Sequence, residues 1–225
     1  MCHGQGLRAG SKNGRVLAVM ILKELDPFCY AGEDALAARV SADRVAYCLR
    51  RFFRRHTGVD VLNGLRLLCA GSIARVDHLL LHPYGLIVLQ RDGTTGPIRI
   101  DNDGQWQHGN NGVQCSIGSP ITSAYMQALL FKSYLDQRVR QKGFFDRLEL
   151  DVLVVVSDDC QITWPQTGRL DEVCSRDEIY DRVIWRIERC RSAATGVGLL
   201  TARERNILGA FLRRSHLPGV GAATG

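Results

Sequence analysis

Two short segments of the sequence carry the residues best suited to metal chemistry, Ala74–His82 (ARVDHLLLH) and Leu86–Asp92 (LIVLQRD). Their apolar runs are typical of strands, and the Pro-Tyr-Gly between them indicates a turn. Side chains alternate along a strand, so Gln90 and Asp92 share a face, and pairing of the strands would bring Asp77 beside them. Carboxylate and amide oxygens suit Mg²⁺, which can also bind the phosphate of a nucleic acid. We therefore expect Asp77, Gln90 and Asp92 to meet, as the acidic groups of many nucleases do.

Two neighbours of these residues are expected to point away from the site. Arg91 lies between Gln90 and Asp92 and faces the opposite side of its strand, so it would join Asp77 only if a bulge shifted the register. His78 follows Asp77 and also faces the other way. We expect His78 to be a hydrogen-bonded structural histidine.

The segment before these strands, Ser41–His56, has apolar residues at helical spacing and is predicted to be a helix with Ser41 as its N-cap. Near its end lie four arginines, Arg50, Arg51, Arg54 and Arg55. They would suit the phosphates of a nucleic acid, and the phenylalanines among them fit that pattern. Cations at a helix C-terminus also favour the helix dipole, so a purely structural reading stays open.

The remaining periodicity completes a mixed α/β pattern. Further strands are expected at Val59–Leu68, Ile98–Asp101 and Leu148–Val156, and further helices at Pro120–Lys142, Asp177–Cys190 and Thr201–Arg214. A polar segment, residues 102–118, is expected to be an excursion whose Trp106 packs over the sheet. This order predicts a single α/β domain with a mixed central β-sheet flanked by helices.

Five motifs in order resemble the nuclease-related domain (NERD) family, a branch of the PD-(D/E)XK nuclease fold. They are MILKELDPF (20–28), DVLNGLRL (60–67), VDHLLLHPYGLIV (76–88), GQW with a later Ser-Pro pair (104–106 and 119–120) and VLVVVSD (152–158). The resemblance covers residues 20–217 and implies a restriction-endonuclease-like core. Residues 1–19 are then expected to be a loose extension and residues 218–225 a frayed tail.

The chain departs from the family pattern at the residues that the resemblance implies for the site. The family has a Glu in the first helix, the Asp of an IDH motif, and the Glu and Lys of an ExK motif. The matching positions here are Asp43, Asp77, Gln90 and Asp92, and the family's later Gln falls at Ser123. An amide therefore replaces one carboxylate, and an acid replaces the lysine that orients the attacking water.

The resemblance implies a role for each of these residues if the site is catalytic. Asp77 is the main metal ligand and Asp92 a substitute ligand, so the two would form a shifted site for Mg²⁺ or Mn²⁺. Gln90 is a weak ligand or positions water, and Asp43 is an outer acid for a second metal or a metal-bound water. A plain solvated acid near a helix start explains Asp43 equally well.

Three functions are compatible with these residues, and they leave open whether the protein is an enzyme. The first is a NERD-family protein with a degenerate site that associates with nucleic acid, DNA foremost, and cuts it weakly or not at all. The second is an active Mg²⁺- or Mn²⁺-dependent DNA endonuclease that hydrolyses phosphodiesters with Asp77 and Asp92. The third is a non-catalytic protein-interaction module. In the first and third cases no cofactor is expected.

Composition narrows the setting of these functions. The 225 residues are 45% hydrophobic and 23% charged, with a net charge of +6, which is typical of a globular chain and compatible with a polyanionic partner. No stretch is long and apolar enough to span a membrane, and the eight cysteines form no CxxC pair, so neither a membrane nor zinc is expected as a partner. Reduced cysteines predict a cytoplasmic protein. The sequence leaves the oligomeric state open, and also whether translation starts at Met1 or Met20.

Overall fold

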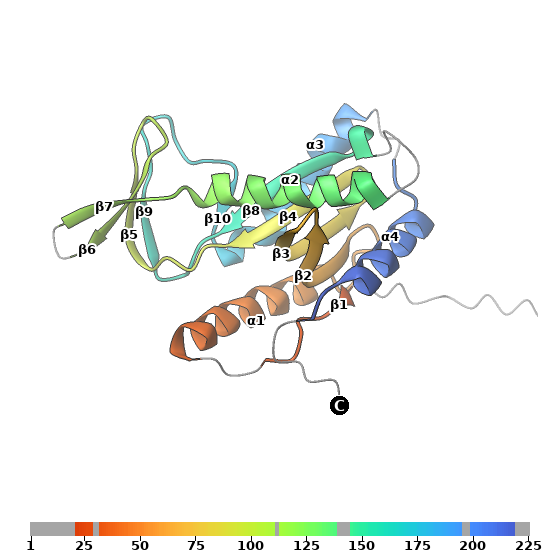
Figure 1. Ribbon diagram of the computed structural model, residues 1–225. Coiled ribbons are helices and arrows are strands. Elements are labelled where there is room, and N and C mark those ends of the chain that lie inside the picture. The colour runs from red at the N-terminus through yellow and green to blue at the C-terminus, as the bar shows by residue number, and fades with distance from the viewer. Residues whose placement is uncertain (1–20, 29–31, 111–112, 139–144, 195–198, 219–225) are drawn as a thin grey trace, which may run out of the picture.

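The computed structural model describes residues 21–28, 32–110, 113–138, 145–194 and 199–218 (Figure 1). The predicted extension, residues 1–19, and all but the first residue of the predicted tail, residues 218–225, lie outside the described residues. The helices are α1 (Glu33–Phe53), α2 (Pro120–Arg138), α3 (Ile179–Ala193) and α4 (Ala202–Ser215). The strands are β1 (Ile21–Lys23), β2 (Asp60–Cys69), β3 (Ser72–His82), β4 (Gly85–Arg91), β5 (Gly96–Ile100), β6 (Trp106–Asn110), β7 (Val113–Ile117), β8 (Glu149–Val155), β9 (Cys160–Thr163) and β10 (Val173–Cys174).

A six-stranded mixed sheet forms the centre of the protein, in the order β1-β2-β3-β4-β8-β10. Strands β2, β3 and β4 pair antiparallel, whereas β1 on β2, β8 on β4 and β10 on β8 are parallel. Helices lie on both faces of this sheet (Figure 1). The predicted mixed α/β domain with a flanked central sheet is therefore confirmed.

Each face of the sheet is buried by its own pair of helices. Apolar side chains of α2 and α4, such as Phe131 and Leu212, pack on one face. Side chains of α1 and α3, such as Leu49 and Val183, pack on the other. Burial of these apolar stripes is the main force that holds the helices to the sheet.

Two buried ion pairs fix the later helices on the sheet. Arg186 of α3 donates to Asp151 of β8 at 2.6 Å, and Arg205 of α4 donates to Asp60 of β2 at 2.9 Å. Buried guanidinium groups need this pairing because an unpaired charge inside a protein is costly. The C-terminal helix thus belongs to the same domain, in line with the single domain that the sequence predicted.

A second, four-stranded sheet, β7-β6-β5-β9, extends from the main body (Figure 1). The sequence predicted only one strand here and an irregular excursion after it. The segment reads as polar because only a few of its side chains are buried, among them Ile98, Ile100 and Trp106. Trp106 is buried in this small core and belongs to the second sheet, so its packing role is confirmed but its expected place over the central sheet is wrong.

The start of the first helix differs from the prediction. Helix α1 begins at Glu33, eight residues before Ser41, so the prediction of Ser41 as its N-cap is wrong. Its first two turns are largely exposed, which is why they lack an apolar stripe. Each of the six described cysteines is free, and none of the described helices is both long and apolar enough to cross a membrane.

Candidate functional site

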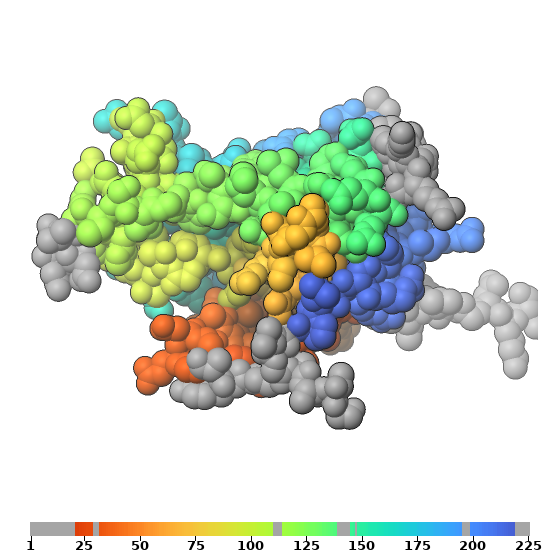
Figure 2. Space-filling model, in the orientation of Figure 1, coloured from red at the N-terminus to blue at the C-terminus, as the bar shows by residue number. Residues whose placement is uncertain are grey.

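A cleft of about 470 Å³ lies between α1 and the strands β2 and β3, and Asp77 lines it. Four arginines share its wall, Arg39, Arg66, Arg75 and Arg91, together with the carboxylate-bearing Asp26. In Figure 2, α1 lies at the lower left of the protein, below the yellow strand segments. The residue that the family pattern places at the centre of the site thus lies in a basic cleft.

Asp77 faces α1 because the strand alternation breaks at this point. On β3, Leu79 and Val76 both pack on the α2 side although they are three residues apart, and on β2 Leu62 and Leu65 do the same. Gly64 lies at the break with φ of +63°, a conformation that glycine adopts without strain. Because both strands deviate from regular alternation at this point, the side chain of Asp77 faces α1 instead of α2.

Arg91 holds the carboxylate of Asp77 from the neighbouring strand. Its backbone N–H donates to Oδ2 at 2.9 Å, its Nε lies 3.3 Å from the same oxygen, and its Nη2 lies 3.4 Å from Oδ1. Its Nη1 donates to the carbonyl of Ala38 on α1 at 2.7 Å. The expectation that Arg91 would point away from Asp77 is wrong, because Asp77 itself changes face.

Gln90 uses its side-chain amide to bridge the backbone of β3. Its Oε1 accepts from the N–H of Asp77 at 3.0 Å, and its Nε2 donates to the carbonyl of Arg75 at 2.9 Å. Regular pairing of β3 and β4 ends at His78 and Leu89, so the amide takes over where the backbone ladder stops. Gln90 lies beside Asp77, and its side-chain amide links β4 to β3 beyond the last regular backbone pair.

The side chain of Asp92 makes its hydrogen bonds within its own loop and not with Asp77 or Gln90. Its Oδ1 accepts from the N–H and the hydroxyl of Thr94, at 3.3 and 2.9 Å. The backbone N–H of Asp92 donates to the carbonyl of Val155 at 2.9 Å, which places Asp92 at the end of β8. Burial raises the pKa of the Cys160 thiol to about 11, and the Asp92 carboxylate adds to the shift. No contact joins the Asp77 and Asp92 carboxylates, and their role as joint metal ligands stays a prediction.

Asp43 lies on the outer side of α1, one turn from the cleft. Its carboxylate accepts from Nε of Arg39 at 2.9 Å, and Arg39 in turn lines the cleft. The Asp43 side chain is about half exposed. Asp43 therefore acts on the cleft through Arg39, and its role as an outer acid stays a prediction.

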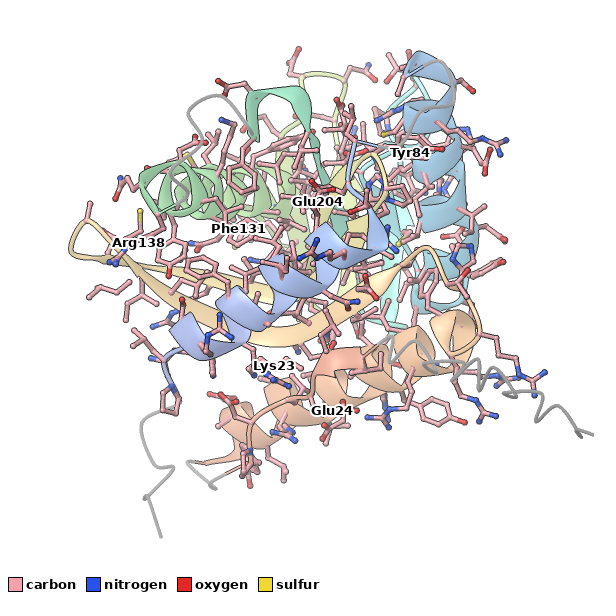
Figure 3. All side chains as sticks on the ribbon, turned by 90° about the vertical axis from the view of Figure 1, so that its right-hand side faces the viewer. Lys23, Glu24, Tyr84, Phe131, Arg138 and Glu204 are labelled. Carbon is pink, nitrogen blue, oxygen red and sulfur yellow. The ribbon has the colours of Figure 1, made fainter. Side chains whose placement is uncertain are left out.

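The rim of the cleft is fixed by a short network around Asp26. Nζ of Lys23 donates to Asp26 at 2.9 Å, and Nε2 of His216 lies 2.8 Å from its other oxygen. Burial alone would raise the pKa of Asp26, but these two hydrogen bonds outweigh it and the pKa is lowered. Nδ1 of His216 accepts from the N–H of Arg66, so the histidine is held in its neutral form. Lys23 and Glu24 lie between α4 and α1 (Figure 3).

The four arginines at the end of α1 gather around one shallow hollow of about 430 Å³. Arg50 pairs with Glu24 at 2.7 Å. Among the described residues, Arg51, Arg54 and Arg55 have no carboxylate within ion-pair distance, and Arg44, about two turns before Arg51, has none either. The phenylalanines between them serve the core: Phe53 is fully buried and Phe52 packs on Tyr180.

The residues present do not fit a divalent cation as they are arranged. Both oxygens of Asp77 contact Arg91, and the Gln90 amide contacts backbone. Asp92 contacts Thr94 through Oδ1, and its buried Oδ2 has no hydrogen-bond partner among the described residues, but no second carboxylate joins it. No group of three His, Cys, Asp or Glu among the described residues is placed to hold a metal ion. Without converging carboxylates the cleft offers a metal little charge to compete with the guanidinium of Arg91.

Sequence reasoning missed the cationic side of the cleft. Arg39, Arg66 and Arg75 come from three elements, and only the folded chain brings them together. One signal was present for Arg91, since Gly64 lies inside the predicted strand Val59–Leu68 and an isolated glycine in a strand often marks an irregularity. The structural role predicted for His78 is confirmed: it is buried, and its Nδ1 bonds to Oδ1 of Asn63 at 2.8 Å.

Comparison with known proteins gives one match. The chain matches the family described as "Nuclease-related domain" over residues 37–157, which is more than half of its length. No curated protein matches the chain. No solved structure matches it either.

Proposed function

Since this chain belongs to the nuclease-related domain family, we propose that it binds nucleic acid, DNA foremost, through the basic cleft and the outer face of α1, and that it cuts weakly or not at all. The single observation that carries the proposal is the Asp77–Arg91 pair, because it sets a fixed cation on the carboxylate that a metal would need. The charge of the surrounding surface then favours a polyanion without metal.

Loss of cutting follows from the chemistry of the altered positions. Phosphodiester hydrolysis in this family relies on acids that hold a metal and on a lysine that stabilises developing charge. Here the second acid is Gln90, whose amide is engaged with the backbone, and the lysine position is Asp92, which is negative. Arg91 supplies a positive charge in the cleft, and its pairing with Asp77 leaves neither oxygen of that carboxylate free to bind a metal.

Binding is supported by cations that no carboxylate neutralises. Arg51, Arg54 and Arg55 line one hollow on α1, and Arg75 lines the cleft; among the described residues none of the four makes an ion pair. Phosphates release counterions when they meet such side chains, so binding weakens steeply as salt rises.

A direct test is fluorescence anisotropy with a labelled oligonucleotide in EDTA, across a series of salt concentrations. The proposal expects binding without metal, with an affinity that falls as salt rises. Absence of binding at low salt, or binding that needs Mg²⁺ or Mn²⁺, would contradict it.

Two other functions stay predictions. An active Mg²⁺- or Mn²⁺-dependent endonuclease would require Arg91 to leave Asp77 when metal and substrate bind. A protein-interaction module would use apolar side chains such as Tyr125, Met126 and Leu129, which are exposed on α2. Metal-dependent cleavage would favour the endonuclease, and lack of any nucleic-acid binding would favour the protein-interaction module.

A further inference from the structure

Tyr47 is the exposed aromatic residue of the basic helix α1. Its side chain is 59% exposed, the largest exposed fraction among the large apolar and aromatic side chains of the described residues. It belongs to none of the core clusters and makes no ring contact with another aromatic residue of the described chain. Folding therefore gives no reason for an aromatic ring at this position.

Arginines lie before and after Tyr47 at helical spacing. Arg44 precedes it by three residues, and Arg50, Arg51 and Arg54 follow it by three, four and seven, which puts them on the same side of the helix. Tyr47 lines three shallow hollows along α1, and each of them also contains at least one of these arginines. An aromatic face with cations on either side is the arrangement that stacks a base and holds its phosphates.

We propose that Tyr47 stacks on an unpaired base, so that the preferred ligand of this protein is single-stranded nucleic acid. This inference rests on the proposed nucleic-acid binding, and it specifies that the ligand is single-stranded. In a duplex the bases are stacked on one another and present only their edges. The ring of Tyr47 would therefore find no free base face to stack on. In a single strand every base has a free face, and the sequence of the strand matters little.

The position of Tyr47 links the stacking site to the cleft. Arg39 lies eight residues before Tyr47 on the same helix, a rise of about 12 Å, and Arg39 lines the cleft that contains Asp77. A strand stacked on Tyr47 can therefore continue along α1 to Arg39 and Arg75. Asp43 lies between Arg39 and Tyr47, and its ion pair with Arg39 reduces the repulsion between its carboxylate and the phosphates of a bound strand.

The test compares a labelled oligonucleotide with its own duplex, each bound by the wild-type chain, Tyr47→Ala, Tyr47→Phe and Tyr125→Ala. Tyr125 is the matched control, because it is 40% exposed on α2, which packs on the other face of the sheet. Tyr47→Ala is expected to weaken single-strand binding roughly 5- to 150-fold and to leave duplex binding unchanged. Tyr47→Phe and Tyr125→Ala are expected to bind as the wild type does.

The other outcomes separate this inference from the function on which it rests. Nucleic-acid binding that depends on the arginines of α1 but is the same for Tyr47→Ala as for the wild type would overturn the stacking role and keep the proposed function. An equal loss of single-strand and duplex binding in Tyr47→Ala would also overturn it. If no chain binds either ligand at low salt, both proposals fail. Thermal unfolding of each variant confirms that it is folded.

Discussion

Arg91 binds Asp77 with its backbone and its side chain together: the N–H lies 2.9 Å and Nε 3.3 Å from the same carboxylate oxygen. A guanidinium thus lies on the carboxylate that the family pattern assigns to a metal ion. This cation balances the charge of Asp77 without a second acid. We infer that this is why an amide at Gln90 is compatible with the fold.

Gln90→Glu tests whether the two side-chain hydrogen bonds of Gln90 stabilise the link between β3 and β4. The new carboxylate can still accept from the N–H of Asp77, but it would face the carbonyl oxygen of Arg75, to which Nε2 now donates. We expect a loss of about 1–2 kcal/mol in unfolding free energy at pH 7, measured with urea against the wild type.

The pH dependence of that loss gives its cause. Repulsion from the carbonyl raises the folded-state pKa of the introduced carboxyl, so the loss should shrink as pH falls toward 5, where the protonated group can donate. Gln90→Met, which removes both hydrogen bonds without adding charge, should lose stability equally at both pH values. A Gln90→Glu variant as stable as the wild type at pH 7 would refute the bridging role.

Gly85→Ala tests the close contact between β4 and β8. A methyl group at Gly85 would overlap the backbone of Glu149, which cannot move without breaking the parallel pairing. We expect the variant to lose about 3 kcal/mol or more, or to fail to fold. Gly118→Ala is the matched control, because its methyl group would meet open space. Equal stability of the two variants in thermal unfolding would contradict the close contact.

The unpaired arginines of α1 make a quantitative prediction about salt. Replacing Arg51, Arg54 and Arg55 together by Gln should weaken single-strand binding and reduce the slope of log affinity against log salt by about 2. The control replaces three exposed arginines of α4 by Gln and so changes net charge equally: Arg203, Arg213 and Arg214. An equal effect of the two triple variants would show that only net charge matters.

Buried histidines make the protein sensitive to mild acid. Burial lowers the pKa of His78 to about 3 and that of His82 to about 4, and it lowers the pKa of His216 as well. The unfolded chain therefore binds protons near pH 6.5 that the folded chain does not, so stability is lost as pH falls below 6.5. We expect roughly 1.4 kcal/mol per pH unit for each fully shifted histidine. Urea unfolding at pH 7 and pH 5 measures this loss, and equal stability at the two values would contradict it.

Most of the main sheet could be predicted from the sequence because its strands are apolar and continuous. Val152–Val155 and Leu79–Leu81 are such runs, and both lie in the centre of the sheet. The small sheet could not, since its strands β6 and β7 read as polar and bury few side chains. Short edge strands such as β10 leave no periodic pattern at all.

The site was predicted in part. The sequence and the family pattern placed Asp77 and Gln90 correctly beside each other on paired strands. They did not reveal the partner of Asp77, because strict alternation assigns Arg91 to the opposite face. The break at Gly64 changes that assignment, and its effect depends on two strands that deviate together.

The most direct test of the central claim is a cleavage assay with plasmid and single-stranded DNA in Mg²⁺ or Mn²⁺, using purified wild-type protein and Asp77→Ala. We predict that the two proteins leave the DNA equally intact, while the wild type still binds it in EDTA. Cleavage by the wild type that disappears in Asp77→Ala would contradict the account, because it would mean that Asp77 is released from Arg91 to bind a metal.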